Sequence, residues 1–201
     1  MSTPPNNFDS PPAASVHFWP GFLDVAFVFS APGRAEAVEQ KPIFDITGRH
    51  LDWALTRHLA PALPTIFPSI DRYDYRITNA HALPLAHALG DARTKAHDAE
   101  IRLPANIERV RDELIGCRLI VLCGDKAKLL KKHLSDFAVV SAGHLSMTGL
   151  NRRWPDRKQL AANPNWTRLG TDERTAQRIS CWARDVAGQV SIVLGVAGSN
   201  D

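Results

Sequence analysis

The chain has 201 residues, 44% hydrophobic and 22% charged, with a net charge of +3. These values are typical of one soluble globular domain with a full core, and the mildly basic balance permits nucleic-acid binding without requiring it. No apolar run approaches the ~20 residues of a membrane span, and three cysteines without a CxxC pair exclude a four-thiolate iron–sulfur cluster.

The first residues of the chain are uncharged and rich in proline and asparagine, which is not the pattern of a signal peptide. We therefore expect a cytoplasmic protein whose cysteines are reduced thiols, Cys117, Cys123 and Cys181. Residues 1–15 are predicted to form a disordered or loosely packed tail, and residues 16–201 a single α/β domain.

The first predicted strand is Val25 to Phe29, a short apolar run with β-branched and aromatic residues. Ser30-Ala31-Pro32-Gly33 ends it, because Pro32 has no amide donor and Gly33 can adopt a positive φ. A polar loop follows, and a helix opens at Thr47-Gly48 with leucines on one face. The loop carries five charged side chains: Arg34, Glu36, Glu39, Lys41 and Asp45.

Three further strands are predicted at residues 73–78, 118–123 and 137–142, with helices at 104–116 and 171–186 and a basic helix after Gly124. Gln189 to Val196 is interpreted as a last edge strand or a packed tail. Strands that alternate with helices indicate a mainly parallel sheet. The predicted fold is α/β, a single-domain three-layer α/β/α sandwich around a four-stranded sheet.

Polar groups follow three of these strands: the loop at residues 30–33, Asn79, and His144. Parallel strands deliver such groups to one edge of the sheet, so we expect them to share a cleft. An amide, an imidazole and a rigid Pro-Gly loop suit recognition of a planar polar heterocycle. No two histidines have metal-ligand spacing on a helix, so no metal site is expected.

Four segments resemble the motifs of the uracil-DNA glycosylase superfamily, in the family's order. Residues 30–36 with 41–52 are similar to its first motif, closest to the branch that reads G-E-A-P-G and then R-P-F-V-G-x-x-G-x-L-L-D. Residues 77–80 resemble the strand that ends in a base-reading Asn, residues 122–127 the strand–helix turn, and residues 143–146 the final H-P-S motif.

The resemblance implies a cofactor-free, monomeric DNA glycosylase that excises a flipped-out uracil or modified pyrimidine, in DNA repair or in defence against phage DNA. It implies that His144 stabilises the leaving base, but at the positions where the family often has an acid or amide for the attacking water this chain has Ser30 and Ala31. Ser30 can orient a water, and the nearest carboxylates of the same loop are Asp45, Glu36 and Glu39. Asp45 is favoured for the water-handling role because it lies just before the helix. The implied base-binding residues are Ala31, Pro32, Gly33, Phe44 (or Ile43) and Asn79. The implied DNA contacts are Ser146, Met147, Leu150, Arg152 and Arg153, with Leu150 or Met147 filling the space that the flipped base leaves in the stack.

The chain departs from this family pattern at two motif positions, and it lacks the cluster-binding cysteines of the family's iron–sulfur branches. Phe29-Ser30 stands where the G-E-A-P-G branch has Gly-Glu, and Leu145 replaces the proline of H-P-S. These departures leave open a non-catalytic DNA-binding relative that has lost its water-activating acid. An enzyme acting on a free nucleoside is a third interpretation, which the basic segment from Arg152 to Lys158 disfavours.

Overall fold

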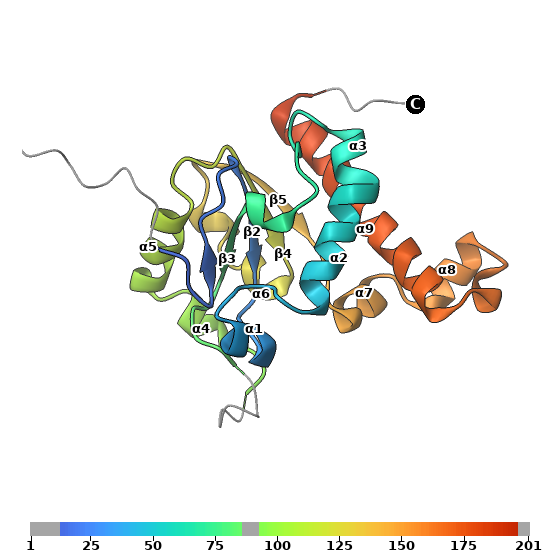
Figure 1. The fold of residues 1–201 in the computed structure, drawn as a ribbon, viewed down its shortest axis with the longest axis horizontal. Coiled ribbons are helices and arrows are strands. Elements are labelled where there is room, and N and C mark those ends of the chain that lie inside the picture. The colour runs from blue at the N-terminus through green and yellow to red at the C-terminus, as the bar shows by residue number, and fades with distance from the viewer. Residues whose placement is uncertain (1–12, 86–92, 197–201) are drawn as a thin grey trace, which may run out of the picture.

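The structure is a computed structural model that describes residues 13–85 and 93–196. Most of the tail expected at residues 1–15 lies outside the described residues. The described chain forms one five-stranded sheet in the order β1-β3-β2-β4-β5 (Figure 1). Its strands are β1 (Phe18–Trp19), β2 (Val25–Phe29), β3 (Arg76–Asn79), β4 (Leu119–Cys123) and β5 (Ala138–Ala142).

The prediction of an α/β fold with a mainly parallel sheet is confirmed, whereas the expected number of strands was wrong. β2, β3, β4 and β5 are parallel, and β1 adds a fifth, antiparallel strand beside β3. In that pair Phe18 lies opposite Thr78 and Trp19 opposite Ile77. The aromatic segment before β2 therefore joins the sheet as well as packing against it.

Helices pack on both faces of the sheet because the central strands are apolar on both sides. Every residue of β2 and β4 is buried. Alternate side chains point to opposite faces, so Phe27 and Phe29 enter one core while Ala26 and Val28 enter another.

The first face is covered by α2 (Ile46–Ala54), the π-helical segment η1 (Leu55–Leu59), α3 (Ala60–Ala62) and the long helix α9 (Thr171–Leu194) (Figure 1). The widened turn η1 has a local cause, because the ring of Pro61 would clash with the carbonyl of Arg57 in a regular α-helix. Interpreting residues 189–196 as a strand was wrong: α9 continues to Leu194 and ends at Gly195, with φ of 63°.

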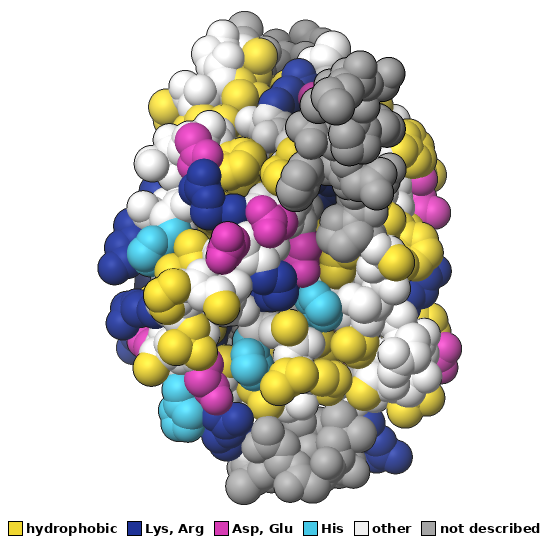
Figure 2. Space-filling model, turned by 90° about the vertical axis from the view of Figure 1, so that its left-hand side faces the viewer, with side chains coloured by type: hydrophobic (Ala, Val, Ile, Leu, Met, Phe, Trp, Pro, Cys, Tyr) yellow, Lys and Arg dark blue, Asp and Glu magenta, His cyan; other side chains and the backbone are white. Residues whose placement is uncertain are grey.

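The second face is covered by α4 (Asp98–Ile101), α5 (Pro104–Glu113) and α6 (Asp125–Lys128). The predicted basic helix is therefore one short α-turn followed by the 3₁₀ turn η4 (Lys131–His133). The surface over α4 and α5 mixes acidic and basic side chains (Figure 2). Many of them are paired, as in Arg109–Glu113, Arg93–Glu100 and Arg111–Asp136.

Three short helices lie where sequence patterns indicated loops: α1 (Arg34–Glu39), α7 (Met147–Arg153) and α8 (Asp156–Ala162). The Ser146 side chain caps α7 by accepting a hydrogen bond from the Gly149 amide at 3.2 Å. Two 3₁₀ turns complete the described elements, η2 (Arg72–Asp74) and η5 (Trp166–Arg168). Within the described ranges, no helix combines the length and apolar character needed to cross a membrane.

Gly48 in α2 lies so close to the preceding loop that the structure excludes a side chain there. A Cβ atom would be 1.9 Å from the Ile43 carbonyl oxygen and 2.7 Å from Arg72 Nε. We expect Gly48→Ala to lower the free energy of unfolding by about 2 kcal/mol, since overpacking forces the backbone to shift. Urea denaturation measures this, with Gly188→Ala in α9 as the matched control.

The control position is open, because nothing lies within 4 Å of a Cβ added at Gly188. There alanine gains helix propensity of about 1 kcal/mol over glycine, so Gly188→Ala is expected to stabilise the protein. Equal stability of the two variants would contradict the close approach of the loop to α2.

Candidate functional site

The candidate site lies at the carboxyl ends of the parallel strands, next to the point where the strand order reverses. β2 has β3 on one side and β4 on the other, and open α/β sheets bind ligands at such switch points. A cavity of about 30 Å³ lies here. It is lined by Phe29, Ala31, Pro32, Glu36, Ile43, Thr47, Asn79 and His144. The loop after β2, the end of β3 and the segment after β5 thus meet in one place.

His144 follows β5 and is held as a neutral imidazole. Its Nδ1 accepts a hydrogen bond from the Ser146 backbone N–H at 3.0 Å, so the neutral ring carries its proton on Nε2. Burial, and then the positive charge of Arg152, lower the pKa of His144 to about 4, against a smaller raising effect of Asp125. The imidazole is therefore a hydrogen-bond donor through Nε2–H at neutral pH.

The position of the His144 ring is fixed by its surroundings. It packs edge-on against Phe29, with 5.8 Å between the ring centroids. On another side lies Gly124, with φ of 102°, where a Cβ would come within 3.0 Å of the His144 ring. The turn after β4 therefore needs glycine both for its backbone conformation and to leave room for the imidazole.

Asn79 ends β3 and is buried, with 1% of its surface exposed. Its Nδ2 donates to the His17 carbonyl oxygen at 3.4 Å, and its own backbone oxygen accepts from Arg109 Nη2 at 2.9 Å. These contacts hold the side-chain amide at the wall of the cavity, where it can read hydrogen-bonding groups of a ligand.

A buried polar cluster lies next to Asn79 and holds this end of β3 in place. Glu113 accepts hydrogen bonds from Arg109 Nη1 at 2.6 Å and from the Thr78 hydroxyl, and it contacts His17 Nε2 at 3.0 Å. Burial alone would raise the pKa of Glu113, but the His17 hydrogen bond, the Arg109 charge and the Thr78 hydroxyl outweigh it and lower the pKa below its ordinary value. The carboxylate therefore anchors both β1 and β3.

The loop before α2 resolves the choice between two candidate wall residues. Ile43 is 4% exposed and lines the cavity, whereas Phe44 is 42% exposed and does not. Ile43 has φ of 45°, a left-handed conformation that costs a β-branched residue about 1–2 kcal/mol. This strained turn directs Ile43 inward, so Ile43 rather than Phe44 forms the wall.

The carboxylate in the cavity is Glu36, from α1. Its Oε2 accepts a hydrogen bond from the Gly33 amide at 3.0 Å, and its Oε1 bonds to none of the residues that the structure describes. Asp45, the carboxylate favoured from the sequence, is absent from the cavity lining and lies exposed at the start of α2, 3.4 Å from Arg49. The geometry therefore offers Glu36, and not Asp45, to a bound water.

Of the other residues predicted to form the base pocket, two line the cavity and one holds a lining residue in place. Ala31 and Pro32 line the cavity, while Gly33 supports it by holding Glu36. Ser30 does not line the cavity; it lies at the end of β2, where its carbonyl oxygen accepts from the His81 amide at 3.0 Å. Thr47 and Phe29 are lining residues that the sequence did not single out.

The predicted DNA contacts all lie on or next to α7, beside His144. Arg152 and Arg153 have side chains 65% exposed; Arg152 lies 2.8 Å from Asp125 and Arg153 lies 3.8 Å from Asp185. Ser146 and Met147 are partly exposed. Leu150 is fully buried in the core, so the expectation that it fills a vacated base stack is not met by this structure.

No group of three or more His, Cys, Asp and Glu side chains within residues 13–85 and 93–196 is arranged to hold a metal ion. The thiols of Cys117 and Cys123 are buried, and burial raises the pKa of both. Their reactive thiolate forms are therefore disfavoured.

Two comparisons with known proteins add no family assignment. No protein-family model matches the chain, and no curated protein matches it either.

Proposed function

We propose that the protein is a DNA glycosylase of the uracil-DNA glycosylase superfamily. It would hydrolyse the N-glycosidic bond of a flipped-out uracil or modified pyrimidine and leave an abasic site. The observation that carries this proposal is that Glu36, Asn79 and His144, which come from separate parts of the chain, line one cavity at the sheet's switch point. The α/β fold with helices on both faces of a mainly parallel sheet is compatible with the three-layer fold of that superfamily.

In this mechanism His144 stabilises the leaving base. Cleavage of the bond leaves negative charge on the base, and a donor placed where that charge develops lowers the barrier. The Nε2–H of a neutral imidazole is such a donor. The neutral His144 ring keeps its proton on Nε2 throughout the reaction. Its hydrogen bond to a carbonyl oxygen of the base becomes stronger as negative charge develops on that oxygen.

In this proposal Glu36 activates the attacking water, the role that was expected of Asp45 and Ser30 from the sequence. Its free Oε1 can accept a proton from a water that attacks the anomeric carbon of the sugar. Glu36 lies six residues after Ser30, in the same loop-and-helix segment that carries the first family-like motif. A general base is therefore retained at this site although the Gly-Glu pair is replaced.

Base selection is assigned to Asn79, with Ile43 and the Ala31-Pro32 segment as apolar walls. The cavity of about 30 Å³ holds roughly one water molecule, far below the 300–1,000 Å³ of ordinary ligand pockets. Entry of a base therefore requires the rim of the cavity to open. Arg152 and Arg153 on α7, with Ser146 and Met147, would contact the DNA beside the flipped nucleotide.

The small cavity also favours a second candidate, a DNA-binding relative without catalysis. Such a protein would hold DNA through the exposed arginines of α7 and never admit a base. Base release from a panel of DNAs, followed by mass spectrometry, separates the two. The panel carries uracil, hypoxanthine, hydroxymethylated and glucosylated pyrimidines. Release of one base supports the glycosylase, and DNA binding without any release supports the second candidate.

A further inference from the structure

A second surface, separate from the cavity, combines an exposed aromatic ring with basic side chains. An open groove of about 360 Å³ lies along the outer face of α2 and η1. It is lined by Arg49, Asp52, Trp53, Thr56 and Arg57. Trp53 is 43% exposed, in contrast to Trp166 and Trp182, which are fully buried. Tryptophan is enriched at binding interfaces, because its indole combines a flat apolar face with an N–H donor.

The spacing along the helix places a guanidinium on either side of this indole. Arg49 and Arg57 lie four residues before and after Trp53, about one helical turn in each direction. Arg57 is exposed and forms no ion pair with any described residue. Arg49 lies 3.4 Å from Asp45, in a pair whose two side chains are both mostly exposed and which is therefore weak. Both arginines remain able to bind an anion.

The acidic member of the groove is already paired. Asp52 forms a salt bridge with Arg72, and Arg72 is largely buried. Arg184 of α9 adds a positive charge near this face. Burial, and then the charges of Arg184 and Arg57, lower the pKa of His58 in η1. The groove therefore presents net positive charge around an accessible aromatic face, unlike the mixed surface over α4 and α5 (Figure 2).

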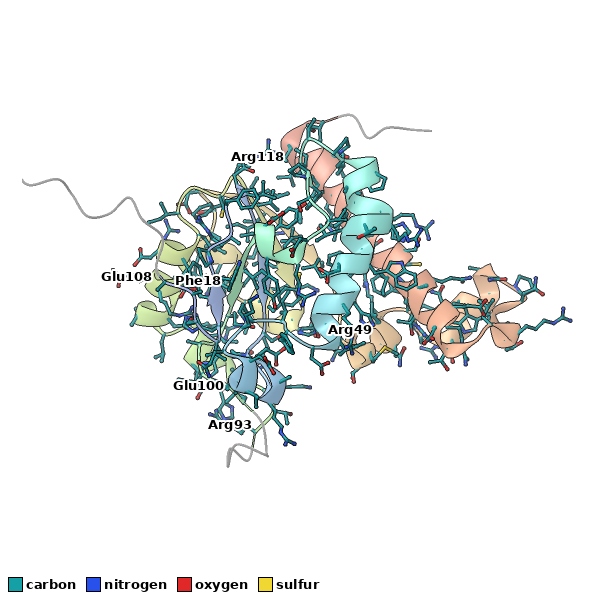
Figure 3. The ribbon with its side chains drawn as sticks, viewed as in Figure 1. Phe18, Arg49, Arg93, Glu100, Glu108 and Arg118 are labelled. Atoms are coloured by element: carbon teal, nitrogen blue, oxygen red, sulfur yellow. The ribbon has the colours of Figure 1, made fainter. Side chains whose placement is uncertain are left out.

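The helix leads from the cavity to the groove. Thr47, in the first turn of α2, lines the cavity, and Trp53 follows six residues later, about 9 Å along the helix axis. Arg49 lies between them in the sequence, in the first turn of α2, at the lower end of this helix in Figure 3. At the rise of about 3.4 Å per nucleotide in a duplex, 9 Å corresponds to two or three nucleotides of one strand.

We propose that this groove binds the DNA strand beside the flipped nucleotide in single-stranded form. One base stacks on Trp53, and the phosphates on either side of it pair with Arg49 and Arg57. Stacking on an aromatic ring together with phosphate pairing is how single strands are bound without sequence preference. The proposal deepens the proposed function and rests on it for the identity of the ligand, whereas the groove's affinity for a single strand can be tested without catalysis.

The test measures the binding of a fluorescent ten-nucleotide deoxythymidine oligomer by anisotropy at fixed salt. We expect Trp53→Ala to weaken binding about 10-fold, which lies within the 1–3 kcal/mol measured for base–aromatic stacking. Trp53→Phe keeps a stacking face and is expected to retain most of the affinity. Arg57→Gln is expected to weaken binding and to lower the slope of log K against log salt by about 0.7.

Two variants outside the groove serve as matched controls. Phe22→Ala removes an aromatic ring that is 76% exposed near the amino-terminal end of β2, and Lys132→Gln removes an exposed charge from η4. Both are expected to bind the oligomer like the unaltered protein. Trp53→Ala binding with unchanged affinity would overturn the proposal, as would displacement of the oligomer by a ten-residue glutamate peptide at equal concentration.

The outcomes also separate this proposal from the glycosylase. If the unaltered protein releases no base but Trp53→Ala loses oligomer binding, the groove proposal is supported and the glycosylase proposal is rejected. Base release that is unaffected by Trp53→Ala, with oligomer binding also unaffected, keeps the glycosylase and rejects the groove.

Discussion

Glu36→Gln is expected to lower the rate of base release by about 10³-fold, within the range that general bases contribute. Glutamine has the same shape, and its carbonyl oxygen can still accept the Gly33 hydrogen bond that Glu36 Oε2 accepts at 3.0 Å. It cannot accept a proton from water. DNA binding is therefore expected to persist, and single-turnover base release at saturating enzyme measures the chemical step alone.

Asp45→Asn is the matched control for this prediction. Asp45 is also a carboxylate of the same loop region, but it lies exposed beside Arg49 and outside the cavity lining. Its loss is expected to change the rate less than about 3-fold, as is usual for surface side chains without a role in the site. A large loss in Asp45→Asn with an active Glu36→Gln would return the water-handling role to Asp45.

His144→Ala is expected to lower base release by about 10²–10³-fold, the usual cost of removing one donor that stabilises developing negative charge. Affinity for DNA is expected to stay nearly unchanged, because the exposed arginines of α7 remain. His144→Gln, which keeps an N–H donor, is expected to retain more activity than His144→Ala. Equal rates for His144→Ala and the unaltered protein would remove the imidazole from the mechanism.

The pH dependence of His144 has a defined sign. Its pKa in the folded protein is about 4, below the ordinary value of 6.5, so the ring stays neutral from pH 8 to pH 5 and base release should not decline over that range through its protonation. The unfolded chain binds the proton more readily, so this residue makes folding less favourable as pH falls from about 6.5 to about 4. His144→Gln should remove that part of the pH dependence of stability.

The sequence was most informative where one local signal sufficed. Strands β2 and β4 were predicted because they are continuous apolar runs. Asn79 and His144 meet at one edge of the sheet, as expected for residues that follow the carboxyl ends of parallel strands. Strand β1 has only two residues, Phe18 and Trp19, which is too short to give a periodic signal. It exists because it pairs with β3, a partner distant in the sequence.

Glu36 was one of three candidate carboxylates of the loop, and Asp45 was preferred to it although a local signal for Glu36 exists. It follows Gly33 by three residues, the spacing at which a glutamate can bond back to the amide that precedes a helix. Recognising that pattern would have predicted α1 and placed this carboxylate beside the Pro32-Gly33 turn. By contrast, Ile43 has a positive φ of 45°, a conformation that is unusual for a β-branched residue and that no local pattern predicts.

The structure differs from the sequence-based expectations at two further places, because both segments are helical although their local composition did not indicate a helix. Residues 189–196 contain β-branched residues typical of a strand, yet Val186 and Val190 continue the buried face set by Ile179 and Trp182 in α9. Leu150 lies in α7, a helix that the Ser146 side chain caps and whose buried residues are Gly149 and Leu150. Sequence reasoning that treated the segment as a loop could not place it.

The most direct test of the proposed function measures two products in one reaction, free base and abasic sites, from the DNA panel described above. A hydrolytic glycosylase releases them in equal amounts, and the double variant Glu36→Gln with His144→Ala should release neither while still binding DNA. If the unaltered protein binds every DNA in the panel and forms neither product, the catalytic proposal is contradicted and the DNA-binding alternative takes its place.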